Sequence, residues 1–282
     1  MKYLRIIARL DIKGDNLVKG VHLEGLRVLG KPEYFATNYF EESIDEIFFQ
    51  DVVASLYQRN TILDVVSRTI NKVSIPLIVG GGINKIDDIT KLLKSGADRV
   101  AINSGAIKNP NLISEAANIF GSSTIVASIE AIKNKDGHHY AYYNNGREHS
   151  GFELVSWCQR LEKLGAGEIC ITSVDNDGTG NGFEIDLVKK INNIINVPII
   201  IHGGCASAND IIEVSKYNIE GVVISSILHY GLIKEISSIE NNSNYKEGNI
   251  VFLNDMRDYN NLNPINIKSL KNKLSEEIRL RH

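Results

Sequence analysis

The sequence has few cysteines, no long hydrophobic run and little excess of charge. Cys158, Cys170 and Cys205 are unclustered among the 282 residues. This usage is typical of a reducing compartment and argues against a disulfide framework or a zinc site. No apolar run approaches the ~18 residues of a membrane-spanning helix, and the N-terminal residues lead into a strand pattern without a signal-peptide hydrophobic region. We therefore expect a cytoplasmic protein with no membrane segment.

The charge balance gives no indication of a nucleic-acid partner. Lys and Arg number 31 and Asp and Glu number 34, so the formal net charge is -3. A general nucleic-acid surface needs a basic patch, whereas this balance is typical of a mixed, solvated surface. The hydrophobic fraction of 43% suits a globular core.

Short apolar runs alternate along the chain with amphipathic stretches. The expected strands are 4–11, 46–51, 76–80, 98–103, 124–130, 168–173, 198–202 and 220–224. The expected helices are 32–42, 60–72, 86–94, 109–120, 151–165, 183–194, 207–215 and 226–236. The strands are almost continuously apolar, as parallel strands buried on both faces should be. This order predicts a single closed (β/α)8 TIM barrel over residues 1–236, with an open doubly wound sheet as the alternative.

The chain also repeats itself. The matching pairs are Pro76 with Pro198, Glu46 with Glu168, and Ser104 with Ser226, each separated by 122 positions (76 to 198, 46 to 168, 104 to 226). This offset predicts a twofold internal repeat, with half-barrels at about 1–122 and 123–236. Residues 237–282 have no counterpart and are expected to form a C-terminal extension on the surface, ending in a basic helix over 267–281.

Polar residues and glycines gather where the expected strands end. They are Asp11, Asp51, Gly80, Gly81, Gly82, Asn103, Ser104, Glu130, Thr172, Asp175, Asp177, Gly203, Gly204, Ser225 and Ser226. The carboxyl ends of the strands form the functional face of such a barrel, so this placement predicts an active site. Asp51, Asp175 and Asp177 are expected either to orient ligand hydroxyls or to cap helices and turns.

Two of the glycine groups indicate phosphate binding. Residues 80–82 and 203–204 each lie between a strand and a helix, and serine hydroxyls follow at the end of the next strand. Glycine lets backbone N–H groups approach a phosphate in front of a helix N-terminus. One such group is equally explained by a tight turn, but two equivalent groups predict a ligand with a phosphate at each end.

Asp11 and Glu130 end equivalent strands of the two half-barrels. Placed between two phosphate sites, they suit general acid–base catalysis. The alternative is structural pairing with Lys13, Lys19 or Lys133.

Two long segments follow the strands that end in these acids. Residues 12–31 are predicted to form a long basic loop that acts as a lid. Residues 132–149 alternate in the manner of a small hairpin. His138 and His139 lie in that hairpin, where adjacent side chains point to opposite faces, so an exposed turn is favoured over a metal site.

Charged residues also occur near the beginnings of alternate strands, at the opposite end of the barrel. They are Arg5, Glu46, Arg99 and Glu168. Such a ring is usually a structural ion-pair cluster, but a ring around the barrel axis could also gate a passage. Both interpretations remain open at this point.

Several motifs carry a resemblance to a known family. They are Arg5-Ile6-Ile7, Leu10-Asp11-Ile12-Lys13, Val18-Lys19-Gly20, Asp51-Val52-Val53-Ala54-Ser55, Val79-Gly80-Gly81-Gly82-Ile83, Asn103-Ser104, Gly165-Ala166-Gly167-Glu168-Ile169 and Asp175-Asn176-Asp177-Gly178-Thr179. With these motifs, residues 1 to about 236 resemble the cyclase subunit of imidazole glycerol phosphate synthase.

The resemblance implies a (β/α)8 barrel that receives ammonia from a glutaminase subunit docked on its amino-terminal face. The family's substrate is a bis-phosphorylated ribulosyl aminoimidazole carboxamide nucleotide. Ammonia attacks its ketose carbon, the intermediate is cleaved and the imidazole ring closes. No cofactor and no metal is implied.

The resemblance also implies roles for individual residues. Asp11 and Glu130 match the two catalytic positions. The implied substrate and phosphate ligands are Lys19, Asp51, Gly81, Gly82, Asn103, Ser104, Thr172, Asp177, Gly178, Gly203, Gly204, Ser225 and Ser226. The implied ammonia gate is Arg5, Glu46, Arg99 and Glu168.

The chain departs from the family pattern at a few positions. Glu130 replaces an aspartate, which moves the carboxylate about 1.5 Å further from the backbone. Arg99 stands where lysine is common, Ala8-Arg9 replaces Pro-Cys, and the extension is added.

Three hypotheses follow. The first is the histidine-pathway cyclase. The second is a divergent branch from surface-sugar gene clusters, in which the barrel channels ammonia for amidination of a nucleotide-linked sugar. The third is a non-enzymatic scaffold for the glutaminase.

Overall fold

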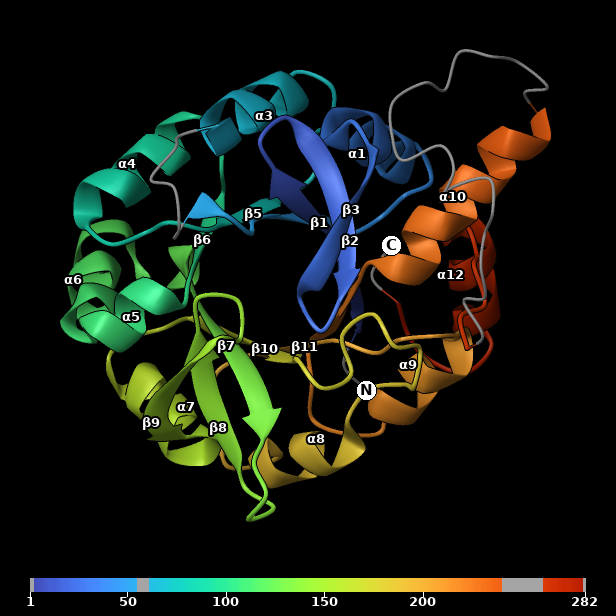
Figure 1. The fold of residues 1–282 in the computed structure, drawn as a ribbon. Coiled ribbons are helices and arrows are strands. Elements are labelled where there is room, and N and C mark those ends of the chain that lie inside the picture. The colour runs from blue at the N-terminus through green and yellow to red at the C-terminus, as the bar shows by residue number, and fades with distance from the viewer. Residues whose placement is uncertain (1–2, 55–60, 240–260, 281–282) are drawn as a thin grey trace.

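A computed structural model describes residues 3–54, 61–239 and 261–280 of the chain. Within these ranges, eight parallel strands form one closed barrel (Figure 1). They are β1 (Arg5–Lys13), β4 (Glu46–Asp51), β5 (Leu77–Gly80), β6 (Arg99–Ile102), β7 (Ile125–Lys133), β10 (Glu168–Ser173), β11 (Ile199–His202) and β12 (Gly221–Ile224). The last strand pairs with the first, Arg5 opposite Gly221. The predicted barrel is therefore confirmed, and the open-sheet alternative is wrong.

Helices surround the barrel, close to where the amphipathic pattern predicts them. They are α1 (Pro32–Glu41), α3 (Thr61–Ile70), α4 (Ile86–Lys94), α5 (Ser104–Lys108), α6 (Asn111–Phe120), α7 (Leu154–Lys163), α8 (Ile185–Ile191), α9 (Ala208–Val214), α10 (Ser226–Ile239) and α12 (Ile267–Ser275), with a 3-10 turn at Ser122–Thr124. Local sequence signals explain where several of these helices begin. Pro32 occupies the first turn of α1, and Ser207 with Asp210 forms a capping box at α9. None of the helices in the described ranges combines the length and apolar character needed to cross a bilayer.

The interior of the barrel is filled in layers, as the alternation of side chains along each strand requires. One layer is wholly apolar and consists of Ile7, Phe48, Ile78, Ala101, Val126, Cys170, Ile200 and Val223. A larger apolar cluster fills the space between the strands and the outer helices. The inner layer separates the charged ring at the amino-terminal end from the polar groups at the carboxyl end.

Two β-hairpins follow the equivalent strands β1 and β7, in agreement with the internal repeat (Figure 1). The first consists of β2 (Asn16–Val21) and β3 (Glu24–Gly30), which extend β1 antiparallel. The prediction of a long loop over 12–31 is therefore wrong, because these residues continue the sheet pairing beyond the barrel rim. The second hairpin, β8 (His139–Tyr143) and β9 (Glu148–Glu153), is confirmed and delays the start of α7 to residue 154.

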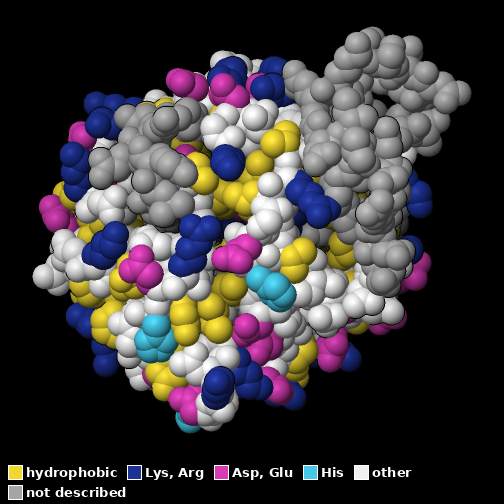
Figure 2. Space-filling model, viewed as in Figure 1, with side chains coloured by type: hydrophobic (Ala, Val, Ile, Leu, Met, Phe, Trp, Pro, Cys, Tyr) yellow, Lys and Arg dark blue, Asp and Glu magenta, His cyan; other side chains and the backbone are white. Residues whose placement is uncertain are grey.

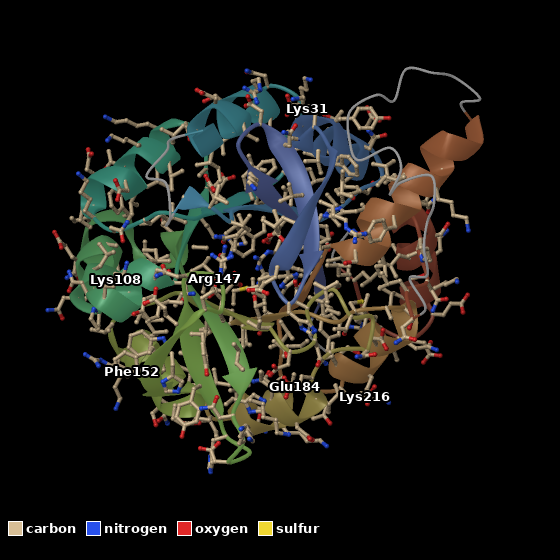
Figure 3. The ribbon with its side chains drawn as sticks, viewed as in Figure 1. Lys31, Lys108, Arg147, Phe152, Glu184 and Lys216 are labelled. Carbon is tan, nitrogen blue, oxygen red and sulfur yellow. The ribbon has the colours of Figure 1, made fainter. Side chains whose placement is uncertain are left out.

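The second hairpin has one exposed and one buried histidine. His138 is exposed just before β8, as expected, whereas His139 is buried, contrary to expectation. His139 is 1% exposed, and its Nε2 lies 2.6 Å from Oε1 of Glu184. Lys190 Nζ lies 3.2 Å from the other ring nitrogen. Glu184 is the residue directly before α8 and lies beside this hairpin (Figure 3). This contact ties the hairpin to the barrel, and the neighbouring ammonium makes His139 a poor metal ligand.

Residues 261–280 of the extension are packed against the barrel rather than projecting from it. Ile267, Leu270 and Leu274 on α12 are fully buried. Leu280 forms a β-bridge with Leu4, and Lys271 Nζ lies 2.6 Å from Asp45 Oδ1. The predicted terminal helix is therefore present but ends earlier, at Ser275. Residues 240–260 and 281–282 lie outside the described ranges.

Candidate active site

The two hairpins flank the carboxyl end of the barrel, where the predicted site residues lie. Basic and acidic side chains are interspersed over this face (Figure 2), as the charge balance led us to expect. Arg147, from the turn of the second hairpin, lies over the mouth of the barrel (Figure 3), with Nε 3.9 Å from Glu24 Oε1 of the first hairpin. Two cavities open beneath this face, one in each half-barrel.

The first cavity is open to solvent. It is lined by Arg9, Gln50, Asp51, Gly81, Gly82, Ile83, Ala101, Asn103, Ser104, Ser128, Glu130 and Asn145. The backbone at Gly81 has φ +110°, and a Cβ atom there would lie 2.5 Å from the carbonyl oxygen of Asp51. Glycine is required at this position, and it leaves the backbone open to the cavity.

The second cavity is also open to solvent. It is lined by Asp177, Gly178, Gly180, His202, Gly203, Gly204, Cys205, Val223, Ile224, Ser225, Ser226 and Leu262. Gly203 repeats the geometry of Gly81, with φ +103° and the carbonyl oxygen of Ser173 blocking any Cβ. The structure thus brings each predicted glycine group together with the serine predicted to accompany it.

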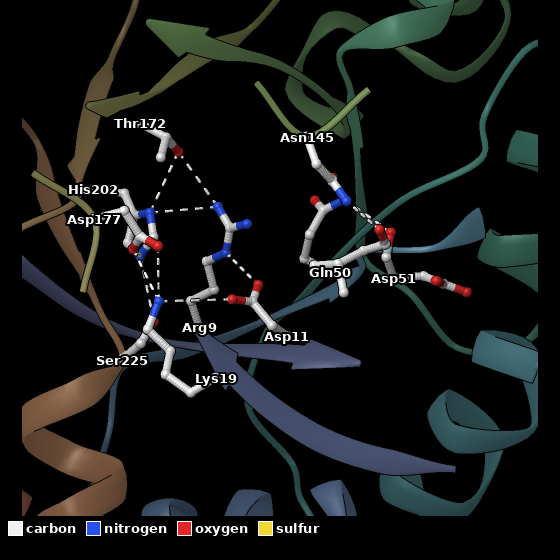
Figure 4. A network of polar contacts seen from close by, with 11 residues as sticks. Arg9, Asp11, Lys19, Gln50, Asp51, Asn145, Thr172, Asp177, His202 and Ser225 are labelled. Carbon is white, nitrogen blue, oxygen red and sulfur yellow. Dashed lines mark hydrogen bonds and ion pairs between the residues drawn. The ribbon is translucent and has the colours of Figure 1, made fainter. Parts of the chain in front are cut away.

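Asp11 is buried within a network of charges between the two halves (Figure 4). Its Oδ1 accepts a hydrogen bond of 2.8 Å from Nε of Arg9. Lys19, from the first hairpin, lies 3.9 Å from Asp11 Oδ2 and donates to both oxygens of Asp177 over 2.9 Å. The ion pair expected as an alternative role for Asp11 therefore exists, with Arg9 as the nearer partner.

Arg9 is the centre of this network. From the sequence it was recognised only as a departure from the family pattern. Its Nη1 lies 3.3 Å from Thr172 Oγ1 and 3.4 Å from His202 Nδ1. Its guanidinium stands 5.7 Å from the ring centre of Phe48, so it rests on the apolar layer below. Burial, together with the charges of Arg9 and Lys19, holds the pKa of His202 well below its usual range. The Nε2 atom of His202 lies 3.3 Å from Ser225 Oγ.

Glu130 faces the same space from the opposite strand. Its Oε2 accepts a 2.7 Å hydrogen bond from the backbone N–H of Gly146. Burial raises the pKa of Glu130 to about 6, although the Gly146 N–H and the charge of Arg9 act in the opposite direction. The charge of Asp11 also raises this pKa. None of the ion pairs found in the described residues joins Glu130 to Lys13, Lys19 or Lys133.

The turn of the second hairpin closes over the first cavity, a contact that sequence reasoning missed. Asn145 donates from Nδ2 to the carbonyl oxygen of Val52 and lines the cavity. The backbone N–H of Asn144 lies 3.2 Å from Ser104 Oγ. The Asn-Asn-Gly turn was visible in the sequence, but its position over Glu130 was not.

Two buried oxygens in this cavity have no hydrogen-bond partner among the described residues. They are Oδ2 of Asp51 and Oδ1 of Asn103. Asp51 Oδ1 accepts a 2.9 Å bond from the Val53 N–H, so this residue caps the loop and still leaves one oxygen unpaired. Burial raises the pKa of Asp51. By contrast, Asp175 is exposed and accepts from the Lys133 N–H at 2.8 Å, which makes it a turn residue.

The charged residues at the amino-terminal end form a closed ring. Arg5 Nη1 lies 2.8 Å from Glu46 Oε1, and Arg99 Nη1 lies 2.6 Å from Glu168 Oε2. Arg5 also pairs with Glu168, and Arg99 pairs with Glu46. The sequence predicted the members of this ring, and the structure shows that each guanidinium bridges both acids.

Together these features define the class of the molecule: a twofold (β/α)8 barrel whose carboxyl end carries two buried acids and two glycine-lined cavities. A family model described as "Histidine biosynthesis protein" matches residues 5–234. The chain is 50% identical over 204 residues to "Imidazole glycerol phosphate synthase subunit HisF" of Legionella pneumophila, covering 72% of this chain and 96% of that protein. It is 45% identical over 229 residues to the protein of the same name from Lactococcus lactis subsp. cremoris (strain SK11), covering 80% and 88%. The chain belongs to this HisF family of histidine biosynthesis proteins.

Proposed function

We propose that this chain is the cyclase subunit of an imidazole glycerol phosphate synthase. The reaction uses ammonia to convert the bis-phosphorylated ribulosyl aminoimidazole carboxamide nucleotide into imidazole glycerol phosphate and aminoimidazole carboxamide ribotide. The observation that carries this proposal is a pair of glycine-lined cavities, each associated with an acid. Glu130 lines the first cavity, and Asp11 is linked through Lys19 to Asp177 in the lining of the second. Identity of 44–50% to HisF relatives supports it.

The cavities would take the two phosphates of the substrate. Backbone N–H groups at Gly81, Gly82, Gly203 and Gly204, with hydroxyls of neighbouring serines, would bind the phosphate oxygens. The unpaired oxygens of Asp51 and Asn103 would accept hydrogen bonds from ligand hydroxyls or amides. Lys19 would reach the ligand from the first hairpin when it exchanges part of its contact with Asp177.

Asp11 and Glu130 would each carry out some of the proton transfers of the proposed reaction. Because its pKa is about 6, Glu130 can both give and take a proton near neutral pH. Asp11 is held in one orientation by Arg9, so its free oxygen has a defined position relative to the bound ligand. Glu130 lines the first cavity and Asp11 is linked through Lys19 to the lining of the second, which suits a ligand stretched between the two cavities.

Ammonia would enter from the amino-terminal end. The ring of Arg5, Glu46, Arg99 and Glu168 would form the entrance, and the apolar layer would carry a neutral molecule toward Arg9 and the acids. The partner would be a glutaminase subunit docked on that end, forming a heterodimer in the cytoplasm. No nucleic-acid or membrane partner is proposed.

The test is turnover of the bis-phosphorylated nucleotide by the purified protein in the presence of an ammonium salt. Asp11→Asn should abolish turnover and leave substrate binding measurable by calorimetry. Tight binding without turnover in the unmodified protein would favour the sugar-amidination or scaffold hypothesis, and absence of binding would overturn the proposal.

A further inference from the structure

Part of the lining of the second cavity comes from outside the two repeated half-barrels. Gly203, Gly204 and Ser226 correspond to groups in the first cavity, but Leu262 belongs to the extension and has no counterpart there. The linings of the two cavities therefore differ where the extension reaches the second one.

The segment 261–266, which we call the strap, is fixed to three separate parts of the second half-barrel. The Asn263 N–H donates to the carbonyl oxygen of Ala206 over 2.9 Å, and the Ile265 N–H donates to that of Ile227 over 3.1 Å. Asn261 Nδ2 donates to Asn181 Oδ1 over 2.9 Å.

These three contacts fall next to the three groups that line the second cavity. Ala206 follows Gly203 and Gly204, Ile227 follows Ser225 and Ser226, and Asn181 belongs to the loop of Asp177 and Gly178. The strap therefore holds together the loops on which phosphate binding at this cavity depends.

Helix α12 anchors the strap at its other end. Ile267, Leu270 and Leu274 are completely buried, and the Ile267 N–H donates to Glu42 Oε2 over 2.7 Å. Lys271 pairs with Asp45 on the same side of the barrel. With its end fixed in the core, the strap presents Leu262 to the cavity as a rigid apolar surface.

We propose that the strap completes the second phosphate subsite and that Leu262 limits this subsite to a compact terminal phosphate monoester. The inference rests on the proposed function and specifies how one end of the substrate is bound. An isobutyl side chain offers no hydrogen bond to a ligand. It excludes water from the phosphate, which strengthens the surrounding N–H and hydroxyl contacts, and it occupies the volume that a second substituent on the phosphate would need.

The first test is steady-state turnover with ammonium and the bis-phosphorylated nucleotide. Leu262→Ala should raise KM about tenfold with little change in kcat, because a lost apolar contact weakens binding without touching the acids. Leu262→Met keeps the volume and should behave as the unmodified protein. Lys268→Ala, an exposed change on α12, is the matched control for general effects on the extension. If the unmodified protein turns over and Leu262→Ala has an unchanged KM, this inference is overturned but the proposed function is not.

The second test needs no turnover and remains decisive if the proposed function fails. The backbone amide resonances of Gly203 and Gly204 are followed during titration with inorganic phosphate and with glycerophosphocholine, a phosphate diester. Phosphate should shift both resonances in the unmodified protein and in Leu262→Ala, whereas the diester should shift them only in the variant. A diester shift of equal size in both proteins, or no phosphate shift in either, overturns the inference.

Discussion

Arg9 donates from Nε to Oδ1 of Asp11 over 2.8 Å, and the two residues lie two positions apart on β1. Side chains at this spacing point to the same face of a strand. The barrel closes that face into an interior where Arg9 also meets Thr172 and His202. The orientation of the predicted catalytic acid thus depends on a buried cation bonded to three strands.

Arg9→Lys should lower kcat strongly and KM only slightly. Lysine keeps the charge, but one ammonium group cannot contact Asp11, Thr172 and His202 in the fork geometry of a guanidinium. Misplacing a catalytic group by ~1 Å costs a factor of about 10² in rate, so kcat with ammonium should fall by that order.

Arg68→Lys is the matched control, because Arg68 forms its ion pairs with Asp15 and Glu33 at the surface. It should leave kcat unchanged. Equal kcat in both variants would show that Arg9 does not orient Asp11.

Glu130→Gln should change how stability depends on pH. Burial raises the pKa of Glu130 from 4.5 to about 6, so the folded protein binds this proton more tightly than the unfolded chain. Its contribution to stability is complete below pH 4.5 and is lost as pH rises through 6. At ~1.36 kcal/mol per pKa unit, the loss is about 2 kcal/mol.

Urea unfolding at pH 4.5 and pH 7.5 measures this effect. The free energy of unfolding of Glu130→Gln, relative to the unmodified protein, should increase by about 2 kcal/mol between the two pH values. Glu115→Gln, an exposed carboxamide exchange on α6, should show no such increase. A decrease for Glu130→Gln would mean that Glu130 is stabilised as a carboxylate in the fold.

Glu168→Gln tests the ring at the amino-terminal end. It removes one of the two buried acids that Arg5 and Arg99 share, which leaves two partly buried cations on Glu46. Breaking a buried ion pair costs about 3 kcal/mol of stability. If the ring is the ammonia entrance, turnover supported by glutamine and a glutaminase subunit should fall more than turnover supported by ammonium.

Lys91→Gln is the control for that variant, because Lys91 pairs with Asp87 in a solvent-exposed position. It should change stability by less than ~1 kcal/mol. An equal fall of both activities in Glu168→Gln would indicate an effect on the site itself and not on entry.

Asn145→Gly and Asn145→Ala separate a side-chain contact from backbone strain. Both variants lose the bond from Nδ2 to the Val52 carbonyl, and both should raise KM several-fold if the turn covers the first cavity. Asn145 has φ +59°, so alanine should cost an additional ~1 kcal/mol in unfolding experiments and glycine should not. Unchanged KM in both variants would show that the turn does not contribute to ligand binding.

The sequence by itself determined the barrel and its repeat, and it predicted the residues that the structure brings together at the carboxyl end of the barrel. Apolar runs at regular spacing indicate local burial, so the ends of the eight strands were predicted to within three residues. The glycine groups at 80–82 and 203–204 were equally visible, because only glycine meets the backbone crowding found at Gly81 and Gly203. The four charges of the amino-terminal ring were found in the same way, from their place along the strands.

Only the tertiary structure decided which of these groups act on one another. Leu262 reaches the second cavity from the far end of the chain, Gly146 meets Glu130 through a hairpin turn, and Arg9 joins three strands. Contacts of this kind depend on strand register and on closure of the barrel, which bring distant residues together. Local periodicity carries no information about that geometry, so these contacts could not be predicted from the sequence.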